Sequence, residues 1–328
     1  NAGGDENPLQ VTINTDQGLP YLPRAMSDEG ALTVDDLRAL CKPLGQKVVP
    51  SWGRFLIASV DVQGNYFEVK ITAFGVDGRR AIIDRYPIKD VPESAPGFAD
   101  RLLEPHTYIE DWDVLLPIMS DVYPVEGQSY GLRVMALACD FHGKPGVSDR
   151  ATTFWRARRK LGEVSKWVCV RGNGGFKVEG RQWYKAPTRA SDGKQARDIK
   201  LLNIATDKHK DTTFAALARP DGGPGSLILG DWMSDDQLKE FTAEKRGDKG
   251  WLKSPNMPRN ESIDLSGYAQ ALADHKGLQK LDPANLKPWA VGGLENPHAV
   301  DLEGGEPLES EPVAPRERKP ARRMSYLE

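Results

Sequence analysis

Cysteine is scarce in this sequence, and its few thiols are widely spaced. Cys41, Cys139 and Cys169 form no Cys-x-x-Cys pair, and their number is odd. Such spacing argues against a structural zinc site, and it predicts a reducing compartment rather than a disulfide framework. Long apolar runs are also absent: no stretch reaches the ~18 residues of a membrane-spanning helix, and the N-terminal region lacks the layout of a signal peptide. The composition therefore predicts a cytosolic protein that makes no membrane contact.

Phosphate-binding loops and strong net charge are missing too. Neither G-x-x-x-x-G-K-[S/T] nor G-x-G-x-x-G after a strand occurs, which argues against a nucleotide-binding loop. The formal charge is only −3 over 328 residues, so a nucleic-acid-binding protein would have to concentrate its basic residues in one patch. With 39% hydrophobic residues, the chain has enough apolar side chains for a sizeable core.

Residues 54–86 predict an antiparallel three-stranded meander. Three apolar, β-branched runs are separated there by Gly64-Asn65 and by residues 76–78. The first run, residues 55–60, is apolar almost throughout, which is typical of a central strand covered on both faces. It ends in Asp61, whose carboxylate requires a partner at such a position. For a lone aspartate that partner is most often a backbone N–H or an arginine.

The next segments predict parallel β-α-β crossovers. In chain order they are a helix over 108–120, an apolar strand over 132–139, a helix over 149–161 and a short strand over 167–170. The apolar strand also ends on an acid, Asp140. A meander followed by such crossovers predicts the mixed sheet of the ribonuclease H-like fold, flanked by helices, with the first strand beside the fourth. Asp61 and Asp140 would then lie at adjacent strand ends.

The remaining segments predict further strands and helices, and the chain as a whole divides into three regions. The later elements are a hairpin over 176–187, strands over 198–206 and 227–230, and helices over 208–217, 235–244 and from Asn260 onward. Asp264 lies on the packing side of that last helix, where an acid is unexpected. We therefore expect a lead-in over 1–50, with a capped helix at 33–40, and a catalytic domain over 51–277. We expect a weakly ordered tail over 278–328, in which short stretches such as residues 286–291 can lie on the core.

Three separated acids on one predicted sheet suggest a metal site. Asp61 and Asp140 end neighbouring strands, and Asp264 lies on a helix that should cover the same sheet. Mg²⁺ and Mn²⁺ prefer oxygen ligands, and two such ions can stabilise both the attacking and the leaving oxygen of a phosphodiester displacement. Each acid alone is more often a cap or turn residue, so the nuclease hypothesis depends on the coincidence of all three.

Several short motifs also follow one another in a fixed order. They are residues 60–63 with 67–75, the acid after the fourth strand, and residues 170–172, 241–244 and 260–264 with Tyr268. In this order they resemble the nuclease half of the large terminase subunit (GpA-like) of lambda-like tailed bacteriophages. Residues 13–15 and 18–20 are similar to the linker between that family's ATPase and nuclease domains. The resemblance covers most of residues 10–275.

The resemblance implies a DNA-packaging endonuclease domain that cuts concatemeric double-stranded viral DNA in the cytoplasm of the infected host. It implies an ATPase domain in the same full-length chain, and the terminase small subunit and the portal protein as partners. It also implies that Asp61, Asp140 and Asp264 are catalytic and bind two Mg²⁺ or Mn²⁺ ions. Possible additional residues are Asp84, His142 and Glu244. The family's usual Asp-Ser-Gly reads Asp-Phe-His-Gly at 140–143 here, which changes the local turn.

A basic stretch over 144–171 adjoins the predicted site and predicts contacts to DNA phosphates. The residues that we expect to bind DNA are Lys144, Arg150, Arg156, Arg159, Lys166 and Arg171. Arg158 and Lys160 fit a solvated helix face equally well.

Three alternatives remain open at this point. Transposase- or resolvase-like ribonuclease H enzymes also place acids after the first and fourth strands. Sugar-kinase and actin-like ATPases begin similarly, but they need two glycine-rich phosphate loops, and residues 61–64 are the only approach to one. A non-catalytic module that docks on the portal would make the acids structural, and the basic run 316–323 would suit an acidic partner.

Overall fold

The computed structural model describes residues 32–303, apart from 176–177, 179, 188–192, 194, 197, 220–221, 248–249 and 255–258. The linker-like motifs at 13–15 and 18–20 and the basic run at 316–323 lie outside the described residues, as does part of the predicted hairpin at 176–187.

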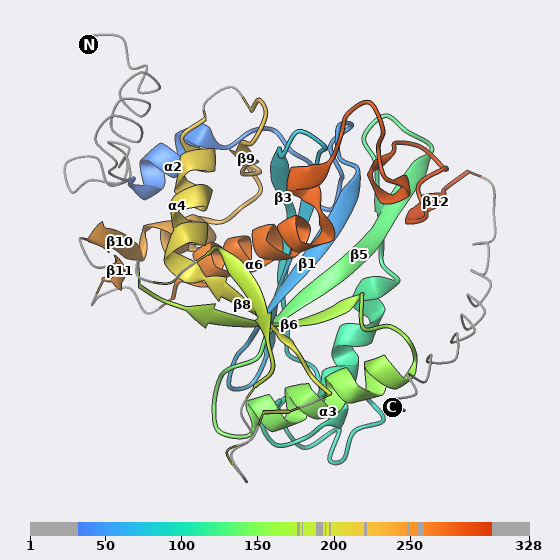
Figure 1. Ribbon diagram of the computed structural model, residues 1–328, viewed down its shortest axis with the longest axis vertical. Coiled ribbons are helices and arrows are strands. Elements are labelled where there is room, and N and C mark those ends of the chain that lie inside the picture. Colours follow the sequence, from blue (N-terminus) through green and yellow to red (C-terminus); the bar gives the residue numbers. More distant parts are fainter. Residues whose placement is uncertain are drawn as a thin grey trace, which may run out of the picture.

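A mixed sheet forms the centre of the domain (Figure 1). Its strands are β1 (Phe55–Val62), β2 (Phe67–Phe74), β3 (Arg80–Ile88), β4 (Val122–Pro124), β5 (Tyr130–Asp140), β6 (Trp167–Asn173), β7 (Gln182–Lys185), β8 (Leu201–Ala205), β9 (Leu227–Ile228) and β12 (Ala299–Asp301). The main order is β7-β8-β6-β5-β1-β2-β3-β9. A separate hairpin consists of β10 (Glu244–Gly247) and β11 (Gly250–Lys253).

The strand pairing confirms the predicted ribonuclease H-like topology. β1, β2 and β3 form an antiparallel meander, and β5 lies parallel to β1 and to β6. β1 is buried on both faces along nearly its whole length, which explains its unbroken apolar sequence.

Helices cover both faces of the sheet. They are α2 (Val34–Leu40), the 3₁₀ helix η4 (Glu110–Met119), α3 (Val147–Lys160), α4 (Thr206–Leu217), α5 (Asp235–Lys239), α6 (Glu261–Lys276) and the short 3₁₀ turns η5 (Glu240–Thr242), η6 (Leu278–Lys280) and η7 (Pro288–Ala290). α6 crosses one face of the sheet over β1 and β5, with α4 beside it (Figure 1). η4 and α3 pack on the opposite face.

Two predicted elements differ in kind or extent. The segment expected as a helix over 108–120 is a 3₁₀ helix, and Pro117 lies inside it, where proline removes a donor from the hydrogen-bond ladder. The helix expected over 235–244 ends at Lys239 and continues as η5. The capped helix near Thr33 is confirmed, since Thr33 and Asp36 form a capping box.

The chain packs on the sheet beyond residue 277, both in the stretch 286–291 that we expected to lie on the core and, beyond it, up to residue 303. Trp289 packs edge-on against Phe55 of β1, with ring centroids 5.0 Å apart. Asn296 is buried and donates to the carbonyls of Arg54 (2.8 Å), Val291 and Trp289. β12 adds an antiparallel partner to β5. Residues 278–303 therefore belong to the packed domain.

Among the residues that the structure describes, no helix is both long and apolar enough to cross a membrane.

Candidate active site

Two acids meet at the carboxyl ends of adjacent strands. The parallel pairing of β1 and β5 places Val60 opposite Cys139, so the next residues, Asp61 and Asp140, are neighbours. Gln63 donates from its side-chain amide to Asp61 Oδ2. The backbone N–H of His142 donates to Asp140 Oδ1 (3.1 Å), so the Asp-Phe-His-Gly sequence folds back on its own acid.

The third acid comes from the helix that crosses these strand ends. Asp264 lies in the first turn of α6, and its negative charge contributes to raising the pKa of both Asp61 and Asp140. The structure therefore brings together the three acids that the sequence singled out. Glu261, one helical turn earlier, also raises the pKa of Asp61 and joins the same cluster.

Burial and neighbouring negative charges raise the pKa of all three carboxyl groups. Burial, followed by the charges of Asp264 and Glu261, raises the pKa of Asp61 to about 6, although the Gln63 hydrogen bond opposes this. Burial and then the charge of Asp61 raise the pKa of Asp140 to about 7. Burial also raises the pKa of Asp264, while Lys210 lowers it. Carboxylates that repel in this way form a place where a cation would be stabilised.

Tyr268 lies among the same three acids. It is one turn beyond Asp264 on α6 and is almost fully buried. Burial, followed by the negative charges of Asp140, Asp264 and Asp61, raises its pKa well above the usual value. A phenol that keeps its proton can donate a hydrogen bond to a neighbouring carboxylate.

A lysine and an asparagine hold Asp264 from the other side. Lys210 of α4 places its Nζ 2.6 Å from Glu244 Oε2 and 3.3 Å from Asp264 Oδ1. The side-chain amide of Asn260 donates to Glu244 Oε1 (2.6 Å) and to Asp264 Oδ2 (2.8 Å). These four side chains form a closed ring. Both oxygens of Glu244 therefore have hydrogen-bond partners, whereas Asp264 has one hydrogen bond, from Asn260, and an ion pair with Lys210.

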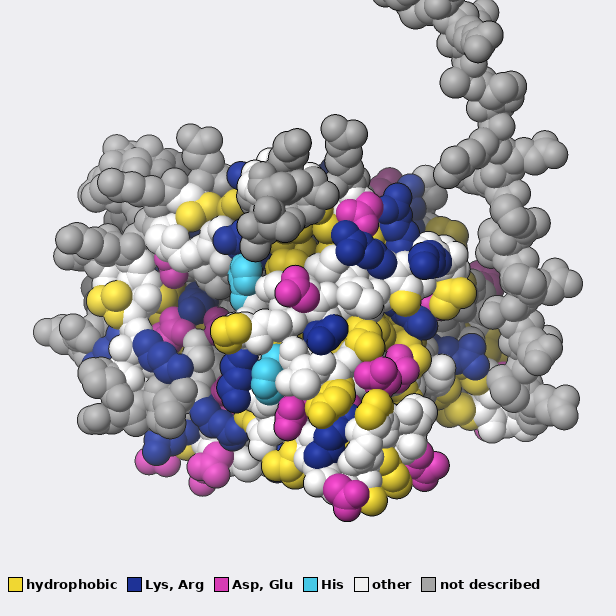
Figure 2. Space-filling model, turned by 90° about the horizontal axis from the view of Figure 1, so that it is seen from below, with side chains coloured by type: hydrophobic (Ala, Val, Ile, Leu, Met, Phe, Trp, Pro, Cys, Tyr) yellow, Lys and Arg dark blue, Asp and Glu magenta, His cyan; other side chains and the backbone are white. Residues whose placement is uncertain are grey.

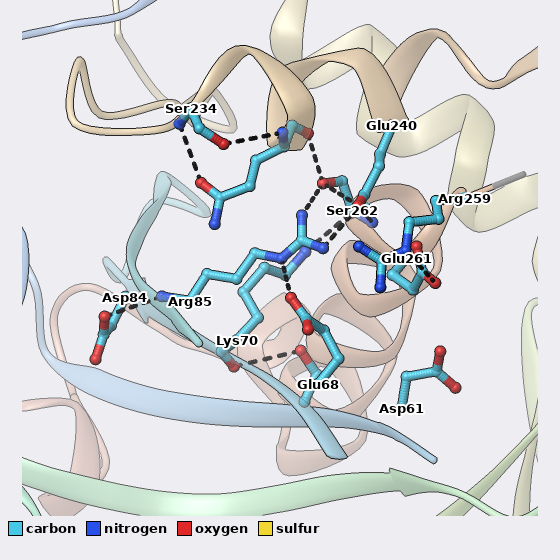
Figure 3. A network of polar contacts seen from close by, with 12 residues as sticks. Asp61, Glu68, Lys70, Asp84, Arg85, Ser234, Glu240, Arg259, Glu261 and Ser262 are labelled. Atoms are coloured by element: carbon cyan, nitrogen blue, oxygen red, sulfur yellow. Dashed lines mark hydrogen bonds and ion pairs between the residues drawn. The ribbon is translucent and has the colours of Figure 1, made fainter. Parts of the chain in front are cut away.

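A buried ionic network fixes the start of α6 on β2 and β3. Lys70 is fully buried and donates to Ser262 O (2.9 Å) and Ser266 Oγ (2.6 Å). Arg85 pairs with Glu68 (2.6 Å) and Glu240 (2.7 Å) and donates to Ser262 Oγ. Figure 3 shows Arg85 between these two acids, with Asp61 and Glu261 beside the network.

The network also supplies a hydrogen-bond acceptor for the first turn of α6. Glu240 Oε2 accepts from the backbone N–H of Ser262 (2.9 Å), one of the donors that a helix leaves unpaired in its first turn. The position of Asp264 is therefore set by contacts from β2, β3 and η5.

Asp84 and His142 lie outside the acid cluster. Asp84 was expected to end the third strand, but it lies in the middle of β3 and is 1% exposed. Its Oδ1 accepts from Gln46 (3.0 Å), and it lines a separate cavity with Asp121 and Tyr123. The suggestion that it ends a strand beside the site is therefore wrong. His142 is exposed beside the acids, and burial and then Arg171 lower its pKa.

The basic stretch divides into two parts. Lys144 lies against the β1–β2 turn, since a Cβ on Gly64 would lie 2.7 Å from its Nζ. Arg150 is in the first turn of α3, and Arg171 directly follows the residue paired with Asp140. These three basic residues are at the end of the sheet that carries the acids.

The other basic residues are engaged elsewhere. Arg156 pairs with Asp198 (2.6 Å), and Arg159 donates to the Asp198 carbonyl (2.8 Å). Lys166 lies alongside Leu137, before the strand ends. In the face seen from below in Figure 2, blue basic side chains are interspersed with acidic and hydrophobic ones. We had expected the whole basic stretch to adjoin the acid cluster, but only part of it does.

The donor set suits Mg²⁺ or Mn²⁺, because all the acids offer hard oxygen ligands and Glu261 Oε2 is buried without a hydrogen-bond partner among the described residues. As the side chains lie, no group of three or more His, Cys, Asp or Glu residues in the described part of the chain is placed so that it could hold a metal ion. One oxygen each of Asp61, Asp140 and Asp264 accepts a hydrogen bond from a neighbour instead. A carboxylate oxygen has further lone pairs, so these donors are compatible with a bound cation.

The sequence alone did not single out Lys210, Gln63 or Glu261. Glu261 stood out only as part of the motif at residues 260–264. Lys210 comes from a helix whose apolar pattern gave no hint that one lysine points inward. Lys210 is distinguished only by its burial, and this burial results from the packing of α4 against α6.

Comparison with known families supplies the remaining finding. Residues 1–285 match the family described as terminase large subunit gpA, endonuclease domain. No curated protein matches the chain. The family match spans most of the 328 residues, including every acid of the cluster. The chain therefore belongs to the family of terminase large subunit gpA endonuclease domains.

Proposed function

We propose that this domain is a metal-dependent endonuclease that cuts concatemeric double-stranded viral DNA during genome packaging. Family membership supports the nuclease role. The observation that carries the mechanism is the meeting of Asp61, Asp140 and Asp264 where β1 and β5 end, since burial and then the charges of Asp61 and Asp264 raise the pKa of Asp140.

These three acids would hold two Mg²⁺ or Mn²⁺ ions. Ions bound there would supply charge stabilisation at the attacking and leaving oxygens of the phosphodiester. Lys210 and Asn260 orient Asp264, and Gln63 orients Asp61. The ion pairs and hydrogen bonds of Arg85 and Lys70 fix the position of α6 relative to the ends of the strands.

DNA would be held by the basic residues that share the sheet edge with the acids. Lys144, Arg150 and Arg171 are at that end. Arg259 is exposed next to Glu261 and stacks over Tyr66. Contacts of this kind neutralise phosphates without reading base sequence. We expect binding that is independent of sequence and weakens steeply as salt concentration rises, which a filter-binding salt series measures.

The partners follow from the family rather than from contacts in this domain. An ATPase domain of the same full-length chain would drive DNA movement, the terminase small subunit would choose the site, and the portal protein would receive the DNA. Host cytoplasm would be the compartment. Base-specific binding by the isolated domain at high salt would contradict this division of labour.

A plasmid-cleavage assay tests the proposal. The wild-type domain should nick or linearise supercoiled plasmid when Mn²⁺ or Mg²⁺ is present, and EDTA should stop the reaction. Asp61→Asn, Asp140→Asn and Asp264→Asn should each lower the rate by at least ~100-fold while leaving the fold intact. Full cleavage by any one variant would remove that residue from the site. Cleavage by all three would support a structural role for the acids and a docking function for the domain.

A further inference from the structure

Glu261 has an oxygen that no neighbour satisfies. The residue is 8% exposed, and its Oε2 is buried without a hydrogen-bond partner among the described residues. A buried carboxylate oxygen left in that state is costly unless something pairs with it. The other oxygen has only distant contacts, with Gln63 Nε2 at 3.4 Å and Arg259 Nε at 3.9 Å.

The unpaired carboxylate faces the acid cluster. The same Gln63 amide that approaches Glu261 donates to Asp61, so the two carboxylates share one donor. Figure 3 shows Asp61 and Glu261 on the same side of the network that anchors α6. Glu261 and Asp264 are three residues apart on one helix, a spacing that places side chains on one face.

Glu244, the other glutamate near the start of α6, is in the opposite situation. It is as buried as Glu261, at 7% exposed, but Lys210 and Asn260 each bind one of its oxygens. The Lys210 ammonium already neutralises the Glu244–Asp264 side of the cluster. The Asp61–Glu261 side has no cation that close among the described residues, since Arg259 is 3.9 Å away and mostly exposed.

We propose that Glu261 is a further ligand of the catalytic metal, completing a set with Asp61, Asp140 and Asp264, and that Glu244 is not a ligand. This inference rests on the proposed nuclease function. A divalent cation held by Asp61 and Glu261 would give the buried Oε2 a partner and would offset the repulsion between the two acids. Lys210 serves as the fixed cation on the other side of Asp264.

Calorimetric titration of Mn²⁺ into the metal-free domain tests the assignment without any cleavage reaction. Glu261→Gln should weaken Mn²⁺ binding at least ~10-fold, because the amide keeps the shape of the side chain and removes its charge. Asp274→Asn is the matched control. Asp274 is also a partly buried acid of α6, but it lies at the far end of the helix beside Gln270, and its substitution should leave Mn²⁺ affinity unchanged.

Melting of the metal-free proteins shows whether the fold is intact, and Glu261→Asp, which retains the charge, provides a second variant. This shorter side chain should bind Mn²⁺ with an affinity between those of wild type and Glu261→Gln. Wild-type affinity in a folded Glu261→Gln domain would overturn the assignment of Glu261 alone. Absence of Mn²⁺ binding by the wild-type domain would instead overturn the proposed function, so the two failures are distinguishable.

Discussion

At the scale of single residues, the acids of this site are costly to keep charged when no metal is bound. The pKa of Asp140 is raised from its usual 3.8 to about 7 in the folded protein. Between these values the folded state binds more protons than the unfolded state, so the free energy of unfolding falls as pH rises through this window. Substitution of Asp140 by asparagine removes this pH-dependent decrease in the free energy of unfolding.

We therefore expect Asp140→Asn to be more stable than wild type in EDTA, by an amount that grows between about pH 5 and about pH 8. The increase should be on the order of 3 kcal/mol. Urea unfolding of both proteins across this range measures it. The difference between the two proteins is the quantity to use, because burial also lowers the pKa of His209 to about 3 and that of His298 to about 4, which gives the opposite slope in both. A pH-independent difference would contradict the raised pKa.

Lys210 gives a second prediction at this scale. Lys210→Met leaves Glu244 and Asp264 without their cation, so the free energy of unfolding should fall by about 3–5 kcal/mol. Lys210→Arg keeps the charge and should retain most of the stability. Added Mn²⁺ should restore part of the loss in Lys210→Met, because a metal ion can replace the ammonium between the two carboxylates. Equal stability of Lys210→Met and wild type would show that the ring is not energetically coupled.

The sequence could indicate some of these residues and not others. Asp61 and Asp140 stand out because each interrupts the end of an apolar run, and Asp264 because it breaks the packing face of a helix. Lys210 and Glu261 lie in ordinary helical sequence, where charged residues are expected on the solvent side. Their inward direction depends on which helices pack together, and a single sequence does not contain that information.

At the scale of elements, α6 is the piece on which the site depends. The sequence predicts that Ile263, Gly267, Ala271 and Tyr268 form a face that lies close on the sheet, and Ala271 and Tyr268 do pack there. The helix is instead buried nearly all round. The side of the helix that faces the sheet includes Leu265, Tyr268 and Leu272. Gly267 faces α4 instead, since a Cβ added at Gly267 would lie 3.4 Å from the Cβ of His209. Periodicity cannot separate two buried faces.

Breaking the anchor of α6 should unfold the domain more easily. Arg85→Met leaves Glu68 and Glu240 as buried, unpaired charges, so the free energy of unfolding should fall by about 3–5 kcal/mol. Arg79→Met is the matched control, because its pair with Asp77 (2.8 Å) is partly exposed and worth less than about 1 kcal/mol. Chemical denaturation of both variants makes the comparison. Similar small losses in both would show that the network does not anchor the helix.

The long elements were predictable and most of the shortest strands were not, although the two-residue β9 lies within the strand expected over 227–230. The central strands have apolar runs of six or more residues, and the pattern of capping residues located α2. β4 and β12 have three residues each and β10 and β11 four, which is too short for an alternating pattern to show. They form because the rest of the fold brings their backbones together.

At the scale of the whole molecule, the C-terminal limit of the folded domain lies beyond Gly277. A chain ending at Gly277 loses the Trp289 ring on Phe55, the three hydrogen bonds of Asn296 and β12. Compared with a chain ending at Glu303, its free energy of unfolding should be lower by about 3 kcal/mol or more. Thermal melting of the two truncated chains measures the difference. Identical melting would restore the boundary at 277 that composition predicted.

Composition predicted only part of the packing after residue 277, for a physical reason. The segment after Lys276 is rich in proline and glycine, which is typical of weakly ordered chain. It packs because a few side chains, Trp289 and Asn296 among them, find complementary places on an existing core. Such complementarity belongs to the whole fold.

The distance along the chain between the parts of the site has a consequence for synthesis. Gln63 approaches Glu261 from 198 positions away in the sequence, and Lys70 reaches Ser262 across 192. Because α6 carries Asp264, the ribosome must release this helix before Asp264 can join Asp61 and Asp140. Under the proposed function, a nascent chain that displays only the meander should therefore not cut nearby DNA. We expect ribosome-stalled chains that end before Glu261 to lack Mn²⁺-dependent nicking, and chains extended past Glu303 with a spacer to acquire it.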